Sequence, residues 1–144
     1  MRTHARQLGS SLLGFLLLVV AAGCGSQGSG GAAAIVDSVV PVSGKVRYAD
    51  GRPVANAWVV LHPKSPPGNE ASAATAADGT FQLGTFGKAD GAVPGRYVVT
   101  VEPHPNAKTS VPQIPKKYTA EQTSTLTAEI TNNGAVTLSP FDLK

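Results

Sequence analysis

Apolar and polar residues alternate along several short stretches of the chain, which is the pattern of a β-strand with one buried face. Seven stretches carry it, at residues 42–48, 57–61, 71–75, 81–83, 97–102, 126–130 and 136–138. The stretch at 57–61 is apolar on both faces, so we expect this strand to be central or covered. The stretch at 71–75 is weak, and the one at 97–102 is the clearest. No window of helical period is long enough to compete with these strands.

Pairs of turn-forming residues separate the expected strands. Asp-Gly pairs at 50–51 and 78–79 predict tight turns, because both residue types favour turn conformations. Asn133-Gly134 is a strong signal for a two-residue loop, and it predicts a hairpin that joins the last two alternating stretches.

The alternation changes phase near the end of the chain. Val136 and Leu138 lie on one parity, whereas Phe141 and Leu143 lie on the other. All four can be buried only if the strand contains a bulge or a bend, and Pro140 is the expected place for it.

The composition supports an all-β fold. The chain has 144 residues, of which 42% are hydrophobic and 15% are charged, and it contains 16 Gly and 11 Pro. So few charges and so many turn formers argue against a helical bundle or a coiled coil. Seven strands in about 100 residues predict a seven-stranded antiparallel β-sandwich with Greek-key order. We expect this domain to occupy residues 38–144.

The N-terminal segment predicts export and a lipid anchor. Residues 1–23 have a basic start and an apolar run that is too short to span a bilayer, which is typical of a cleaved signal peptide. The only cysteine, Cys24, directly follows and resembles the lipidated cysteine of the bacterial lipobox, which implies acylation, for instance with palmitate, and attachment to a membrane. The alternative is an ordinary secretory signal followed by a chance cysteine. Residues 24–37 are rich in Gly, Ser and Ala and are expected to form a flexible tether.

Five motifs carry a resemblance to a known domain. They are Val-Ser-Gly-Lys-Val at 42–46, Asp-Gly-Arg-Pro-Val at 50–54, Ala-Trp-Val-Val-Leu at 57–61, Ala-Asp-Gly-Thr-Phe at 77–81 and Pro-Gly-Arg-Tyr-Val-Val at 94–99. Their succession resembles the carboxypeptidase regulatory-like domain, which has a prealbumin-like sandwich fold. Together with Ile-Pro-Lys-Lys-Tyr at 114–118 and Phe-Asp-Leu at 141–143, the chain is similar to small planctomycete lipoproteins that carry this domain alone. The resemblance implies a fold rather than an activity, because the domain serves as a scaffold in many contexts.

The charge balance excludes a nucleic-acid-binding protein. The full chain has 12 basic and 9 acidic residues, but Arg2 and Arg6 belong to the expected signal. The mature chain would therefore be almost neutral. Nucleic-acid binding needs a basic stripe, usually with interleaved aromatic residues, and the sequence does not provide one.

The residues available for catalysis or metal binding are sparse. His62 and His104 each precede a proline at the end of an expected strand, and zinc sites usually need three or four protein ligands. The Gly-x-Ser-x-Gly pattern of a nucleophile elbow does not occur in the sequence. We therefore expect a protein that is not an enzyme, with no catalytic residue, no metal and no cofactor.

The residues at 103–119 suggest a surface for a partner. This segment is rich in proline and contains Lys108, Lys116 and Lys117 without any acidic residue. One interpretation is a docking surface for an anionic polymer or another envelope protein. The other is a solvated loop that wraps around the sandwich, with Ile114 and Tyr118 as its anchors.

Aromatic residues are the second candidate for binding. Trp58 lies on the face of its strand opposite the core, with Phe86 and Tyr118 as candidate neighbours. It either packs under the loop at 103–119 or stays accessible as a platform for a ligand. Trp58 and Tyr118, with the three lysines of the loop, make up the candidate binding surface.

Two function classes follow from these observations. The first is a membrane-anchored envelope lipoprotein whose sandwich is a structural or protein-interaction module. The second is an envelope module that binds carbohydrate. In both cases the lipid on Cys24 holds the protein at the cell envelope, with the outer membrane or an outward-facing leaflet favoured.

Overall fold

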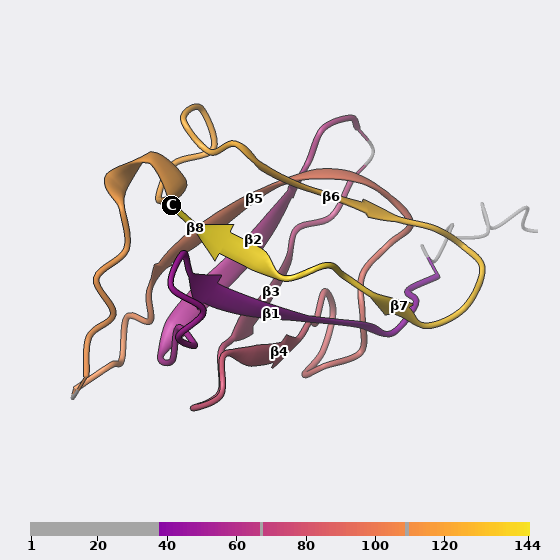
Figure 1. Cartoon of the computed structure of the whole chain (residues 1–144). Helices are drawn as coiled ribbons and strands as arrows, with labels where there is room; N and C mark the ends of the chain where they lie inside the picture. Colours follow the sequence, from indigo (N-terminus) through magenta and orange to yellow (C-terminus); the bar gives the residue numbers. More distant parts are fainter. Residues whose placement is uncertain (1–37, 67, 109) are drawn as a thin grey trace, which may run out of the picture. The chain divides into compact units, whose positions relative to one another are not determined.

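The computed structural model describes residues 38–66, 68–108 and 110–144 (Figure 1). The expected signal and tether, at 1–23 and 24–37 with Cys24, lie outside the described residues. The described chain forms eight strands and one short 3₁₀ turn. These are β1 (Val42–Tyr48), β2 (Ala57–Pro63), β3 (Ala71–Ala74), β4 (Thr80–Gln82), β5 (Gly95–Pro103), η1 (Lys116–Tyr118), β6 (Leu126–Ile130), β7 (Val136–Thr137) and β8 (Phe141–Leu143).

The strands form two sheets, which confirms the expected all-β sandwich (Figure 1). Each sheet has four described strands. The sheet with the longer strands, called the larger sheet, has the order β3-β2-β5-β6 and is antiparallel. The smaller sheet has β1 at its centre, with β4 as one neighbour and β7 and β8 as the others. Because β2 lies between β3 and β5, the expectation that this strand is central is also confirmed. Among the residues that the structure describes, no helix is long and apolar enough to cross a membrane.

Two details of the expected sandwich are wrong. The described residues form eight strands rather than seven, because the residues after Pro140 form a strand of their own, β8, instead of continuing β7. Both strands run parallel to β1, so the smaller sheet is mixed rather than antiparallel. Alternation along a strand reports which face is buried, and it contains no information on the direction of the neighbouring strand.

The hairpin expected at Asn133-Gly134 is also wrong. β6 pairs with β5 in the larger sheet, whereas β7 pairs with β1 in the smaller one, so the turn carries the chain from one sheet to the other. Gly134 has a φ of +104°, a conformation that glycine adopts readily. The turn signal therefore predicted the local bend, and packing far along the chain decided which strand pairs with β7.

The predicted bulge near Pro140 is confirmed by the register of the parallel pairs. Val42 of β1 lies opposite Val136, and Val46 lies opposite Phe141. The segment from β7 to β8 therefore has one residue more than β1 between the two pairs. The extra residue changes the parity of the strand. Phe141 is therefore buried on the same side as Val136, which is partly buried against the core.

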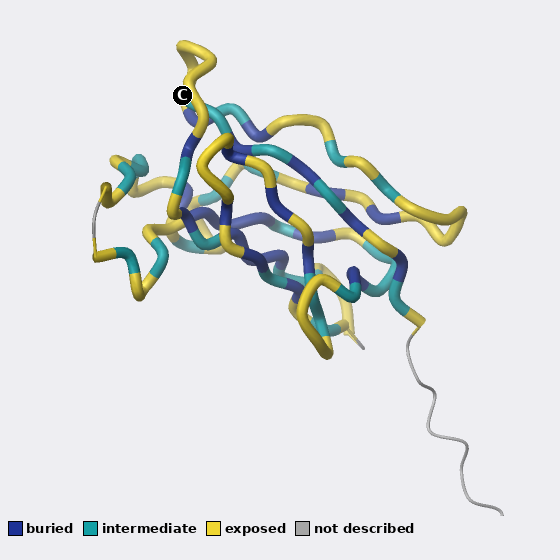
Figure 2. Tube along the Cα trace, turned by 90° about the horizontal axis from the view of Figure 1, so that it is seen from below, coloured by how far each residue is buried: buried dark blue, intermediate teal, exposed yellow. Residues whose placement is uncertain are grey.

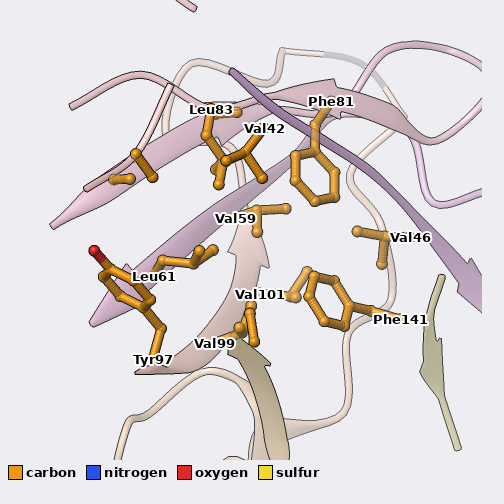
Figure 3. Close-up of a cluster of buried hydrophobic side chains, with 14 of the residues drawn as sticks. Val42, Val46, Val59, Leu61, Phe81, Leu83, Tyr97, Val99, Val101 and Phe141 are labelled. Atoms are coloured by element: carbon orange, nitrogen blue, oxygen red, sulfur yellow. The ribbon is translucent and has the colours of Figure 1, made fainter. Parts of the chain in front are cut away.

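The inward faces of both sheets form one hydrophobic core (Figures 2 and 3). Side chains of β2 and β5 point toward those of β1 and β4 (Figure 3). The rings of Phe81 and Phe141 stack within it, with centroids 6.1 Å apart and an interplanar angle of 6°. Gly44 lies directly against the Phe81 ring, and a Cβ at this position would overlap it. The Phe81 ring thus requires a glycine at the facing position of β1, the neighbouring strand in the same sheet.

Both expected Asp-Gly turns are formed. Gly51 and Gly79 have φ values of +85° and +78°, a region that glycine occupies at little cost. In each turn the preceding aspartate accepts a hydrogen bond, 3.0 Å long, from the backbone N–H two residues on. The side chains therefore fix the turns as the sequence predicts.

The second of these turns joins the edge strands of the two sheets. β3 pairs with β2 and β4 pairs with β1, but the two strands are also bonded to each other at both ends. The N–H of Ala76 donates to the carbonyl of Thr80 at 2.8 Å, and Ser72 and Gly84 exchange two bonds of 2.9 and 3.0 Å. This connection closes one side of the sandwich and places the loop at 84–89 next to it.

Candidate ligand-binding groove

A groove of about 1160 Å³ lies at the side of the sandwich where β3 and β4 meet. Its lining comes from both of these strands, from the loop at 84–89, and from outward-facing residues of β1, β2 and β7. A hollow of this size lies just above the range of about 300–1,000 Å³ for small-ligand sites, which are commonly apolar with a few polar groups. The groove is therefore the candidate functional site.

Trp58 reaches the groove from the outer face of the larger sheet. It lies opposite Ala74 of β3, and its half-buried ring lies edge-on to the ring of His104, with centroids 5.2 Å apart and an angle of 74°. Its indole N–H has no hydrogen-bond acceptor among the described residues, where every fully buried polar side-chain atom has a partner. The N–H is thus not fully buried, and within the described chain it is left unpaired to donate to a ligand.

Phe86 is the second aromatic side chain in the lining. It is 60% exposed, although it is a large apolar residue. The loop that carries it is held by Asp90, whose carboxylate accepts bonds from the N–H groups of Thr85 at 2.8 Å and of Phe86 at 3.2 Å. The hydroxyl of Thr85 also donates to the carbonyl of Gly91 at 2.9 Å. The exposed ring is therefore presented by a fixed loop, and little order would have to be gained on binding.

The charged residues of the groove are all basic. Lys45 of β1 and Lys88 of the loop line it, and no described acidic or histidine side chain does. Neither lysine makes an ion pair with a described residue. Asp78 lies outside the lining, and hydrogen bonds from Thr80, together with a smaller effect of the Lys45 charge, lower the pKa of its carboxyl. A groove with charges of one sign attracts ligands of the opposite sign.

The candidate residues of the segment at 103–119 lie elsewhere. Lys108, Lys116 and Lys117 are exposed, and none of them lines the groove. Tyr118 is only 3% exposed and belongs to the core, where its hydroxyl accepts a bond of 3.1 Å from the N–H of Lys144. Of the five residues in the expected binding surface, Trp58 alone lies in the groove. Phe86, weighed as its neighbour, lies there as well.

His62 is part of a second polar arrangement, on the outer face of the larger sheet. Its Nε2 lies 2.9 Å from the hydroxyl of Thr100, and its Nδ1 lies 2.8 Å from a carboxylate oxygen of Glu70. A hydroxyl, an imidazole and a carboxylate in this order can activate a nucleophile. Thr100 is only 3% exposed, however, so a substrate cannot reach its hydroxyl without displacing the strand. We interpret the arrangement as a bridge between β2, β5 and the start of β3.

The sequence did not reveal the lysines of the groove or this polar arrangement. Lys45 and Lys88 are far apart in the chain, as are His62 and Thr100, and no motif spacing connects them. Only the pairing of the strands brings them together. Phe86 carried a weak signal, because a large apolar residue in a loop between glycines has no strand to bury it.

Comparison with known proteins adds no family to this description: no family model matches the chain, and no curated protein matches it.

Proposed function

We propose that this chain is a non-catalytic binding module of the cell envelope, held at a membrane by a lipid on Cys24. The observation that carries the proposal is the groove, whose lining combines the exposed ring of Phe86, held on a fixed loop, with Trp58 and its N–H, which is unpaired among the residues described. Exposed apolar side chains that gather in a hollow are typical of ligand sites.

The chemistry of the lining supports binding rather than catalysis. Hydroxyl, amide and ammonium groups line the groove next to the aromatic rings, and the described lining offers no carboxylate, imidazole or thiol. General acid–base catalysis commonly uses carboxylate, imidazole and thiol groups. The hydroxyl of the Thr100–His62–Glu70 arrangement is buried, which makes it a poor nucleophile for a dissolved substrate.

The class of ligand is either a protein of the envelope or a carbohydrate. The lining of one groove by both Trp58 and Phe86 favours carbohydrate, because a sugar ring has an apolar face that packs on aromatic rings. The finer fold assignment, a prealbumin-like sandwich with Greek-key order, belongs to the same proposal. It is supported by the motif succession from 42–46 to 94–99 and by the two-sheet arrangement.

The anchoring part of the proposal is tested by replacing Cys24 with serine. The full chain with its native N-terminus is expressed in a bacterial host, and membrane and soluble fractions are compared. We expect the wild-type chain in the membrane fraction and the Cys24→Ser variant released after signal cleavage, because the acyl chains are gone. A cleaved variant that remains in the membrane fraction would refute a lipid anchor at Cys24.

The binding part is tested with the fluorescence of Trp58, the only tryptophan of the chain. Detergent extracts of cell envelopes, separated into protein and polysaccharide fractions, are titrated into the full-length protein. We expect one fraction to change the emission, and Phe86→Ala to weaken this response. Val111→Ala is the matched control, since Val111 is also exposed, at 56%, but lies outside the groove. Equal responses of the two variants would contradict a binding role of the groove.

A further inference from the structure

We infer that the groove binds a polysaccharide built of uronic acid units, with sugar rings against Trp58 and Phe86 and carboxylates at Lys45 and Lys88. This inference rests on the proposed function, which makes the groove a binding site, and it adds the chemistry of the ligand.

The aromatic residues define how a sugar would lie. One face of a pyranose ring consists of C–H groups, and such a face packs against the π-system of an aromatic side chain. Trp58 provides a ring and a free N–H donor, and Phe86 provides a ring that is 60% exposed. Aromatic side chains of this kind combine a large apolar area with a polar group at the edge. A sugar satisfies both, because it carries hydroxyl oxygens around an apolar face.

The polar residues of the groove match a ligand rich in hydroxyl groups. Ser43 of β1 lies opposite Gln82 of β4 and opposite Thr137 of β7, so the three side chains form one row across the smaller sheet. All three line the groove. Each can donate and accept hydrogen bonds, as a row of sugar hydroxyls requires.

The strand edges at the groove argue against an extended peptide. A peptide that adds to a sheet needs a row of free backbone groups on an edge strand. Here β3 and β4 are bonded to each other at Ser72–Gly84 and Ala76–Thr80, and each is paired with its own sheet on the other side. The backbone offers no long free edge, so recognition falls to side chains.

The charges point to an acidic sugar rather than a neutral one. Lys45 and Lys88 line the groove without a described acidic side chain in the lining and without an ion pair to a described residue. The exposed lysines at 108, 116 and 117 carry the same charge, but the ring beside Lys117, that of Tyr118 at 4.9 Å, is only 3% exposed. The groove combines positive charge with the exposed ring of Phe86 in one lining.

The experiment compares three polymers to distinguish the contribution of negative charge to binding from that of the sugar ring. The full-length protein, purified in a non-ionic detergent, is titrated with polygalacturonate, with its neutral methyl ester, and with poly-L-glutamate. Emission of Trp58 and its quenching by acrylamide are measured. We expect polygalacturonate alone to change the emission and protect the ring from the quencher. The methyl ester should bind at least about tenfold more weakly, because the carboxylates no longer meet the lysines.

Paired lysine variants then locate the charges. We expect Lys45→Gln with Lys88→Gln to weaken polygalacturonate binding about tenfold or more. The control is Lys116→Gln with Lys117→Gln, which removes the same charge from the exposed loop and should leave binding unchanged. Circular dichroism verifies that both variants are folded.

The outcomes separate the inference from the proposed function. Equal loss in both lysine pairs, or equal binding of poly-L-glutamate, would overturn the inference in favour of diffuse electrostatics or an acidic peptide. A response of Trp58 to an envelope fraction but to no acidic polysaccharide would also overturn it while leaving the proposed function intact. If neither the envelope fractions nor the acidic polysaccharide changes the emission of Trp58, both the inference and the proposed function are rejected.

Discussion

Replacing Thr75 with valine tests how the pairing of β2 and β3 ends. The N–H of Thr75 donates to the carbonyl of Ala57 at 2.9 Å, and the hydroxyl of Thr75 accepts a bond of 2.9 Å from the N–H of Ala57. The hydroxyl thus stands where a backbone carbonyl would continue the ladder. Ala57 is fully buried and Thr75 is 5% exposed, so water cannot replace the hydroxyl. Valine keeps the shape and removes the acceptor.

The magnitude follows from two opposing effects. A buried N–H that loses its partner costs about 1–3 kcal/mol. The methyl group that replaces the hydroxyl adds apolar burial, which offsets up to about 0.8 kcal/mol. We therefore expect Thr75→Val to lower the free energy of unfolding by about 0.2–3 kcal/mol. For a domain of this size each kcal/mol lowers Tm by about 4–8 °C.

The assay combines unfolding with amide hydrogen exchange. Urea unfolding followed by Trp58 emission gives the change in stability, and exchange of the Ala57 amide reports the bond itself. Thr75→Ser retains the hydroxyl, so it should keep this amide protected even if the lost methyl lowers stability. Thr127→Val, on an exposed position of β6, shows what the same substitution does without a buried partner. If Thr75→Val is as stable as the wild type and its Ala57 amide stays protected, the reasoning is refuted.

Three further predictions concern the core, the acid range and metals. Gly44→Ala should destabilise the domain by about 1–3 kcal/mol in urea unfolding, because the added methyl group overpacks against Phe81. Phe81→Leu in the same chain should recover part of the lost stability. An unchanged stability of Gly44→Ala would contradict the close packing. The hydrogen bond from Arg47 lowers the pKa of Asp142. The stabilisation that the carboxylate contributes is therefore present above the pKa of an unfolded Asp, about 4, and it is lost as the pH falls through the lower pKa of the folded state. Stability measured from pH 7 to pH 2 should therefore depend less on pH in Asp142→Asn, and identical slopes would argue against the pair. Residues 38–144 should fold alone with a Tm that a chelator does not change; a drop of several degrees would reveal a bound metal.

The buried faces could be predicted from the sequence because they depend on local alternation. The apolar residues on both faces of 57–61 predicted a central strand, and the change of parity around Pro140 predicted a bulge or a bend. The structure has the central strand and the bulge. Strand pairing was harder, because it joins residues far apart in the chain. Nothing in the local sequence of Val136–Thr137 shows that β1, rather than β6, is the neighbour. The Asn-Gly signal therefore gave a wrong hairpin at a correctly predicted turn.

The candidate site was only partly visible in the sequence for the same reason. Trp58 could be placed on the outer face by parity, and Phe86 could be named as a neighbour. The lysines of the groove come from β1 and from a loop, and they line one groove because the chain around β4, which pairs with β1, is also bonded to the chain around β3. Tyr118 had two interpretations, as part of a binding surface or as an anchor of the loop at 103–119, and the 3₁₀ turn Lys116–Tyr118 directs it into the core as an anchor.

The parallel pairing of β8 with β1 has a consequence for the order in which the domain is built. Arg47 and Asp142, which form an ion pair between these strands, are 95 residues apart, whereas all four strands of the larger sheet lie within residues 57–130. A chain synthesised from its N-terminus can assemble the larger sheet first, while β1 waits with one edge unpaired. Until β8 emerges, that edge is open to pairing with another chain, so the growing protein carries an aggregation-prone strand edge.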